Sequence, residues 1–209
     1  MAWNFGNILD TIIPVLPEGH LALVHGDREI TWAEMGRRSN NFGRFMLENG
    51  ASIGDKVGFY MRNRPEYMET LAACFRARLT HVNVNYRYVA DEVHYIFDNS
   101  DAATVVYGKE FRDNVEILRP RLPNVKLWIE VGDGANLPAD TYDYENLATS
   151  GKGENLDVAR EAGDLLFLYT GGTTGMPKGV MWEHDALRET QTMALRALGD
   201  VPETLDELK

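Results

Sequence analysis

A short apolar strand and the start of a helix follow one another in the segment Val57-Gly-Phe-Tyr-Met-Arg-Asn-Arg-Pro-Glu66. The apolar run from Val57 to Met61 predicts a buried strand. Pro65 stands where proline is common, at the first position of a helix. The residues after it place apolar side chains at helical spacing: Tyr67, Leu71, Ala72 and Phe75. A strand that leads directly into a helix is the repeating unit of a parallel sheet.

This alternation of strand and helix extends along the chain in both directions. Upstream, residues 21–31 predict a small hairpin, and Thr31 with Glu34 has the spacing of a capping box for a helix that ends near Gly50. Downstream, we expect strands at 81–84, 103–107 and 126–131 and helices at 91–97 and 111–118. The whole pattern predicts an α/β fold with a mostly parallel sheet flanked by helices.

The periodic pattern loosens between Gly132 and Gly163, where Gly, Asp, Asn and Pro are frequent. We therefore predict two parts, with residues 1–150 as an N-terminal α/β subdomain and residues 151–209 as the beginning of a second subdomain. The second part is expected to contain an apolar strand at 165–169, a Gly/Thr loop, a short strand at 180–182 and a helix over residues 185–198.

The composition argues against several classes of protein. A formal charge of -11 opposes non-specific binding to nucleic acid or to anionic lipid. Cys74 is the single cysteine, so neither an intramolecular disulfide nor a cysteine metal cluster can form, and the five histidines show no metal-ligand spacing. The sequence lacks the pattern of a secretory signal and has no run approaching the ~18 apolar residues of a transmembrane segment. We therefore expect a cytoplasmic protein.

The segment with the clearest chemistry is Tyr169-Thr-Gly-Gly-Thr-Thr-Gly-Met-Pro-Lys-Gly-Val180. It places three glycines, three threonines and one lysine within nine residues after a buried-type strand. Glycines allow successive backbone N–H groups to converge on one anion, while hydroxyls and an ammonium add donors and charge. The pattern predicts a site for a polyphosphate. A Walker loop is excluded, because Lys178 is followed by Gly179 rather than by Ser or Thr.

This loop resembles the signature of the adenylate-forming superfamily, which includes acyl-CoA synthetases, firefly luciferase and the adenylation domains of peptide synthetases. The superfamily signature reads Thr-Ser-Gly-Thr-Thr-Gly-x-Pro-Lys-Gly, and this chain departs from it only at Gly171, where serine is usual. Weaker resemblance covers residues 30–35, 54–57 and 77–87. Val84-Asn-Tyr-Arg-Tyr88 and the loop look most like bacterial acyl-CoA synthetases that act on fatty or sterol-derived acids.

The resemblance implies a two-step reaction. A carboxylic acid attacks the α-phosphorus of ATP, bound with Mg²⁺, to give acyl-AMP and pyrophosphate, and coenzyme A then displaces AMP. It also implies that hydroxyls and backbone amides hold the β- and γ-phosphates, while Lys178 neutralises charge as the catalytic residue. The expected site residues are Thr170, Gly171, Gly172, Thr173, Thr174, Gly175 and Lys178, with no protein ligand to a metal.

Members of the superfamily are considerably longer, and their downstream elements near adenine, ribose and metal have no counterpart in these 209 residues. We therefore expect an N-terminal fragment of an acid-thiol ligase that is inactive by itself. The alternative is a stand-alone domain that binds nucleotide or a partner without turnover. Apolar faces left without the rest of the fold predict a homo-oligomer or binding to another polypeptide.

Other polar and aromatic residues receive structural interpretations. His184 comes just before an expected helix, where capping or packing is more frequent than catalysis. Asn85 and Arg87 are expected to fix a loop rather than to contact a ligand. The aromatic residues Trp32, Phe42 and Phe45 are expected in the core.

Overall fold

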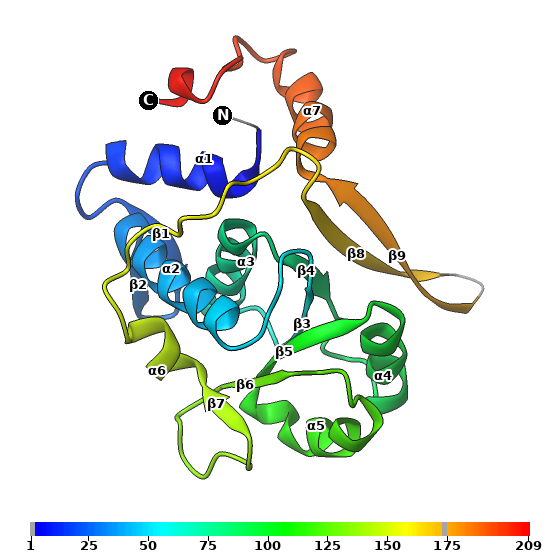
Figure 1. The fold of residues 1–209 in the computed structure, drawn as a ribbon. Coiled ribbons are helices and arrows are strands. Elements are labelled where there is room, and N and C mark those ends of the chain that lie inside the picture. Colours follow the sequence, from blue (N-terminus) through cyan, green and yellow to red (C-terminus); the bar gives the residue numbers. More distant parts are fainter. Residues whose placement is uncertain (1–2, 173–174) are drawn as a thin grey trace.

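The computed structural model describes residues 3–172 and 175–209 of the chain (Figure 1). Its main feature is a seven-stranded sheet with the strand order β7-β6-β5-β3-β4-β8-β9. Neighbouring strands are parallel except for β8 and β9, which form an antiparallel hairpin. The strands are β3 (Lys56–Tyr60), β4 (Thr80–Asn83), β5 (Ala102–Gly108), β6 (Leu127–Val131), β7 (Thr141–Asp143), β8 (Leu165–Gly172) and β9 (Gly175–Glu183).

The helices and a small second sheet complete the fold. An antiparallel pair, β1 (Leu21–His25) and β2 (Arg28–Thr31), precedes the large sheet. The α-helices are α1 (Phe5–Ile12), α2 (Trp32–Glu48), α3 (Pro65–Ala77), α4 (Ala90–Asn99), α5 (Arg112–Leu118), α6 (Tyr144–Thr149) and α7 (His184–Leu195). Within the described ranges, no helix has both the length and the apolar character needed to span a membrane.

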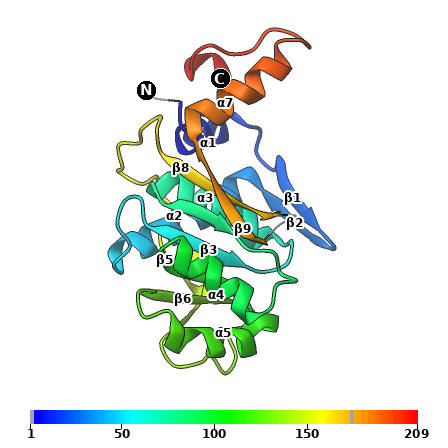
Figure 2. The ribbon, with the colours of Figure 1, turned by 90° about the vertical axis from the view of Figure 1, so that its right-hand side faces the viewer.

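Helices cover both faces of the large sheet (Figures 1 and 2). Phe42 of α2 and Phe59 of β3 lie in a buried cluster that also contains side chains of α3 and α6. On the other face, Tyr60 of β3 and Phe97 of α4 lie in a second cluster with side chains of α5. The neighbouring strand residue Gly58 has no room for a side chain, because an added Cβ would lie 2.2 Å from the Phe97 ring. The strand alternation therefore builds two cores, as expected of a doubly covered sheet.

Helix α1 was not among the elements expected from the sequence. Asn4 caps it by accepting a hydrogen bond from the Gly6 amide at 2.8 Å, and its own amide group donates to Asp164 Oδ2 at 2.8 Å. Gly6 allows the close approach, since an added Cβ would lie 2.5 Å from the Phe75 carbonyl oxygen of α3. Long-range polar contacts therefore hold α1 against α3 and residues 159–164. With α7, it lies at the end of the molecule that carries both termini (Figures 1 and 2).

The expected α/β pattern is confirmed, with some differences in the bounds. Thr31 caps α2 by accepting from the Glu34 amide at 3.1 Å, and Gly50 beyond the helix adopts a φ of 104°. Strand β9 is longer than expected because its pairing with β8 continues to the loop, and α7 ends at Leu195. The hairpin belongs to the same sheet as β4, while the subdomain boundary near residue 150 stays a prediction.

The three aromatic residues expected in the core differ in burial. Phe42 is fully buried in the cluster between α2 and the sheet. Phe45 is partly buried and packs against the same cluster, and its ring contacts that of Tyr142 at a centroid distance of 4.9 Å. Trp32 is only half-buried. The expectation is therefore confirmed for Phe42 and is too strong for Trp32.

Candidate phosphate-binding site

The predicted phosphate loop lies at the tip of the β8–β9 hairpin, which projects from the edge of the large sheet (Figure 1). The two strands pair in register from Leu165 opposite Glu183 to Thr170 opposite Lys178. The loop therefore joins two strands and does not open a helix, as expected from the sequence. This hairpin differs from a Walker loop, whose phosphate groups lie at the N-terminus of a helix.

The hairpin brings two of the predicted site residues together. Thr170 and Lys178 are direct cross-strand partners, so their side chains leave the same face of the hairpin. Both are exposed, and neither has a hydrogen bond or ion pair to another described residue through its side chain. A hydroxyl and an ammonium are thus available at neighbouring positions. An anion at this face can accept from both groups.

The strand register changes between Thr170 and the pair Gly172–Gly175. Gly171 stands alone on β8 in this interval, whereas Met176 and Pro177 stand on β9, which is the geometry of a bulge. Pro177, which has no N–H, is tolerated here because a residue in a bulge does not have to donate a hydrogen bond to the neighbouring strand. A bulge leaves its extra residue outside the regular strand pairing.

Gly171, where the superfamily usually has serine, is not required by lack of space. Among the described atoms, the nearest to an added Cβ would be the Tyr88 hydroxyl at 3.5 Å, an ordinary van der Waals distance. The φ angle of Gly171 also lies outside the left-handed region. Serine would therefore fit at this position, and its absence removes one hydroxyl donor from the site.

The remaining predicted site residues are placed only in part. The backbone of Gly172 ends β8 and that of Gly175 begins β9, so both flank the tip of the hairpin. Thr173 and Thr174 lie outside the described residues. Their assignment to the site stays a prediction.

Two asparagines that the sequence interpretation did not single out hold the base of the loop. Asn83, the last residue of β4, accepts from the Tyr169 amide at 2.7 Å and donates to the Tyr169 carbonyl oxygen at 3.3 Å. The Tyr169 hydroxyl donates to Asn99 Oδ1 at 2.8 Å. Burial raises the pKa of Tyr169, which keeps this hydroxyl protonated as a donor. The available signal was the position of Asn83 at the carboxyl end of a parallel strand, where ligand sites gather.

His184 has the packing role expected from the sequence. It is 2% exposed, and its ring meets that of Phe75 nearly edge-on at a centroid distance of 4.9 Å. Its Nδ1 accepts from the Phe5 amide at 3.4 Å. Burial lowers the pKa of His184 to about 4, so the ring is neutral near pH 7. A neutral ring packed between α1 and α3 is a structural element of this region.

Asn85 and Arg87 also follow the expected structural interpretation. The Asn85 side chain accepts from the Arg87 amide at 3.0 Å and closes a turn after β4. The Arg87 guanidinium lies 5.5 Å from the centre of the Tyr86 ring. Both residues therefore organise the loop between β4 and α4.

The described residues provide no obvious metal site. Nowhere in residues 3–172 and 175–209 do three or more His, Cys, Asp or Glu side chains group in a way that could hold a metal ion. The donors at the hairpin are a hydroxyl, an ammonium and backbone amides, which suit phosphate oxygens rather than a divalent cation.

The glycine- and threonine-rich hairpin lies at the edge of a doubly covered, mostly parallel sheet, so the chain is an α/β protein whose loop differs from a P-loop. A family described as AMP-binding enzyme matches residues 15–205. Because this match includes most of the chain, the protein belongs to the AMP-binding enzyme family.

Relatives of known function are acyl-CoA ligases. The chain is 40% identical over 188 residues to a 3-oxocholest-4-en-26-oate–CoA ligase of Rhodococcus rhodochrous, covering 88% of this chain and 34% of that protein. It is 36% identical over 192 residues to a medium/long-chain-fatty-acid–CoA/3-oxocholest-4-en-26-oate–CoA ligase of Mycobacterium marinum, covering 88% and 35%. The chain therefore spans about a third of the length of these relatives.

Solved structures of CoA ligases share the fold. The putative long-chain-fatty-acid CoA ligase of Rhodopseudomonas palustris superposes with a TM-score of 0.82 at 22% identity, over 94% of this chain and 48% of that one. The anthranilate CoA ligase AuaEII, solved in complex with anthranoyl-AMP, gives a TM-score of 0.84 at 22% identity over 91% and 36%. The fold is thus that of the N-terminal region of adenylate-forming ligases.

Proposed function

We propose that this chain is the N-terminal, phosphate-holding part of an ATP-dependent, AMP-forming acyl-CoA ligase. The observation that carries the proposal is the pairing of Thr170 with Lys178 on one face of the hairpin, directly beside the bulge that Met176 and Pro177 form opposite Gly171. Family membership supplies the reaction class, and the relatives' names support a fatty or sterol-derived acid as substrate.

In the proposed reaction, a substrate carboxylate attacks the α-phosphorus of ATP and pyrophosphate leaves. Thr170 and the backbone amides of the loop hold the β- and γ-phosphates in line with the attack, and Lys178 offsets the charge that builds on the leaving group. Mg²⁺ neutralises phosphate charge when it is bound with ATP. The thioester then forms when the sulfur of coenzyme A displaces AMP. The chain acts by positioning and electrostatics, without a covalent protein intermediate.

Binding and turnover are expected to separate in the 209 residues taken alone. The hairpin supplies phosphate contacts, whereas turnover also requires the acid and ATP to be held together, and such positioning can contribute about 7 to 11 kcal/mol. Acid-dependent pyrophosphate exchange, measured with a panel of fatty and aromatic acids, should therefore be undetectable. A relative of full length serves as the positive control. Robust pyrophosphate exchange by the purified chain would contradict the expectation that phosphate binding and turnover separate.

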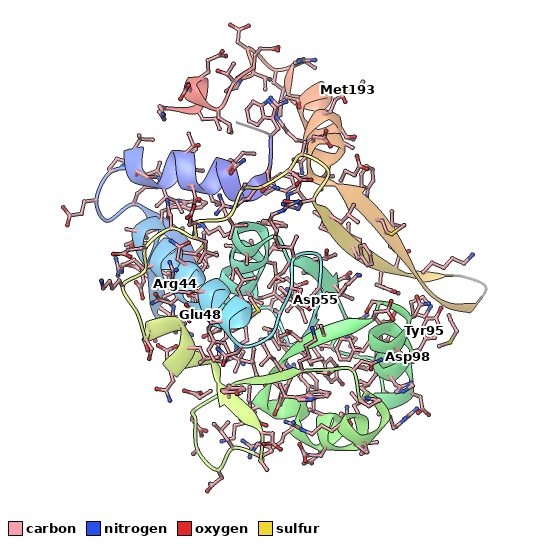
Figure 3. All side chains as sticks on the ribbon, viewed as in Figure 1. Arg44, Glu48, Asp55, Tyr95, Asp98 and Met193 are labelled. Carbon is pink, nitrogen blue, oxygen red and sulfur yellow. The ribbon has the colours of Figure 1, made fainter. Side chains whose placement is uncertain are left out.

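We also propose that the chain self-associates through the β8–β9 hairpin and α7. Strand β9 is at the edge of the sheet, and this region exposes several large apolar side chains, an arrangement that favours pairing with another chain. Its exposed members are Leu168, Met176, Val180, Met181, Met193 and Leu195, and Leu198 is exposed just after α7. Met193 is 67% exposed on α7 (Figure 3).

Light scattering after size-exclusion chromatography is expected to show a dimer or larger species. Met193→Glu should shift it toward the monomer, because a carboxylate is costly to bury in an apolar interface. Ile117→Glu on α5 is the matched control, since Ile117 is 55% exposed outside this surface. A wild-type monomer, or equal responses of the two variants, would contradict the proposal.

A further inference from the structure

Strand β8 leaves the edge of β4 shortly before the phosphate loop begins. The recorded pairing of these parallel strands is Val82 with Phe167. The next residue of β4 is Asn83, and its side chain hydrogen-bonds the backbone of Tyr169 in β8. One carboxamide group therefore continues the contact between β4 and β8 at the base of the loop.

The Asn83 carboxamide satisfies both backbone groups of Tyr169. Its oxygen accepts from the Tyr169 N–H at 2.7 Å and its nitrogen donates to the Tyr169 carbonyl at 3.3 Å. A carboxamide has the donor and acceptor of a peptide group, so it can continue a strand ladder by one step. Aspartate would keep the acceptor and lose the donor, and an apolar residue would lose both.

Tyr169 is also fixed on its other sides. It pairs with Gly179 of β9, and its ring lies so close that a Cβ on Gly179 would be 2.9 Å from the ring carbons. Its hydroxyl is held by Asn99 at the end of α4, and the whole residue is 9% exposed. The pair Tyr169–Gly179, one on each strand, is therefore held in place. Because Thr170 and Lys178 form the next pair toward the tip, the position of Tyr169 sets the direction in which their side chains project.

We propose that Asn83 is a positioning residue for the phosphate loop, which clamps the backbone of Tyr169 so that Thr170 and Lys178 are presented together to a phosphate anion. Asn83 acts through Tyr169 and does not itself contact the ligand. Clamping the base lowers the ordering cost that the loop meets when an anion binds, which is the benefit of preorganisation. This inference rests on the proposed function of the hairpin.

The test compares wild type with Asn83→Ala, Asn83→Asp and the control Asn85→Ala, which alters the neighbouring turn but not β8. Hydrogen exchange resolved to single amides reports on the clamp, with β6 as an internal reference for global stability. Calorimetric titration with pyrophosphate reports on its consequence. In Asn83→Ala, the Tyr169 amide should exchange at least about tenfold faster, while β6 stays protected.

Affinity for pyrophosphate should fall about three- to tenfold in Asn83→Ala and remain at the wild-type value in Asn85→Ala. Asn83→Asp should protect the Tyr169 amide nearly as well as wild type, because it keeps the acceptor. If the alanine variant fails to fold, Asn83→Leu replaces it, since leucine is of similar size, has neither donor nor acceptor, and should show the same two losses. Unchanged Tyr169 exchange, or faster exchange without loss of affinity, would overturn the inference. If wild type binds no pyrophosphate, the proposed function fails, and the exchange result alone decides whether Asn83 holds the loop.

Discussion

Asp10→Asn is expected to destabilise the chain by about 3 kcal/mol or more, because it removes the carboxylate that two largely buried arginines share. Asp10 accepts from Arg76 Nε at 3.0 Å and from Arg160 Nη1 at 2.7 Å. The arginine side chains are 1% and 4% exposed, so neither can exchange this partner for water. A loss of this size is a large part of the about 5 to 15 kcal/mol that stabilises a typical domain.

Urea unfolding followed by circular dichroism measures this loss. The matched control is Asp91→Asn, which breaks an ion pair to Arg121 whose side chains are 84% and 39% exposed. Pairs of this kind contribute about 1 kcal/mol or less. Equal destabilisation by the two variants would show that Asp10 does not hold α1 in the way the geometry indicates.

Lys178→Ala is expected to weaken pyrophosphate binding about 10- to 100-fold. A hydrogen bond to a charged group contributes about 1.5 to 3 kcal/mol, and each 1.4 kcal/mol is about a factor of ten in affinity. Lys178 is exposed on the hairpin and has no competing ion pair among the described residues, so its ammonium is available to the anion. Lys178→Arg should recover part of the affinity, since it keeps the charge but changes the geometry of the donors.

Local patterns were sufficient to predict most of the fold. The apolar run before Pro65 and the capping spacing of Thr31 and Glu34 depend on near neighbours in sequence, and the expected strand–helix alternation is found in the structure. Helix α1 was missed although its local signals are present, because Asn4 can cap it and Phe5, Ile8, Leu9 and Ile12 recur at helical spacing. Only its docking depends on distant residues. Asn4 contacts Asp164, 160 residues away, and Asp10 contacts Arg160, 150 residues away. Periodicity carries no information about such contacts.

The sequence was sufficient to predict which segment forms the candidate site, but not which of its side chains lie next to one another. The Gly/Thr loop indicated which residue types were present, while the pairing of Thr170 with Lys178 depends on the register of β8 and β9. That register is set by the hairpin as a whole, including the Tyr169 ring over Gly179. Asn83 was not predicted because its role comes from a contact 86 residues away, whereas Asn85 lies in a local motif.

Calorimetric titration of pyrophosphate into wild type, Lys178→Ala and the control Lys152→Ala is the most direct test that this hairpin holds the phosphates of ATP. Lys152 is an exposed lysine in the segment before β8, so its removal changes the net charge equally. We expect weak binding by wild type, similar binding by Lys152→Ala, and binding weakened about 10- to 100-fold in Lys178→Ala. Equal affinities for wild type and Lys178→Ala would place the phosphate elsewhere and contradict the account.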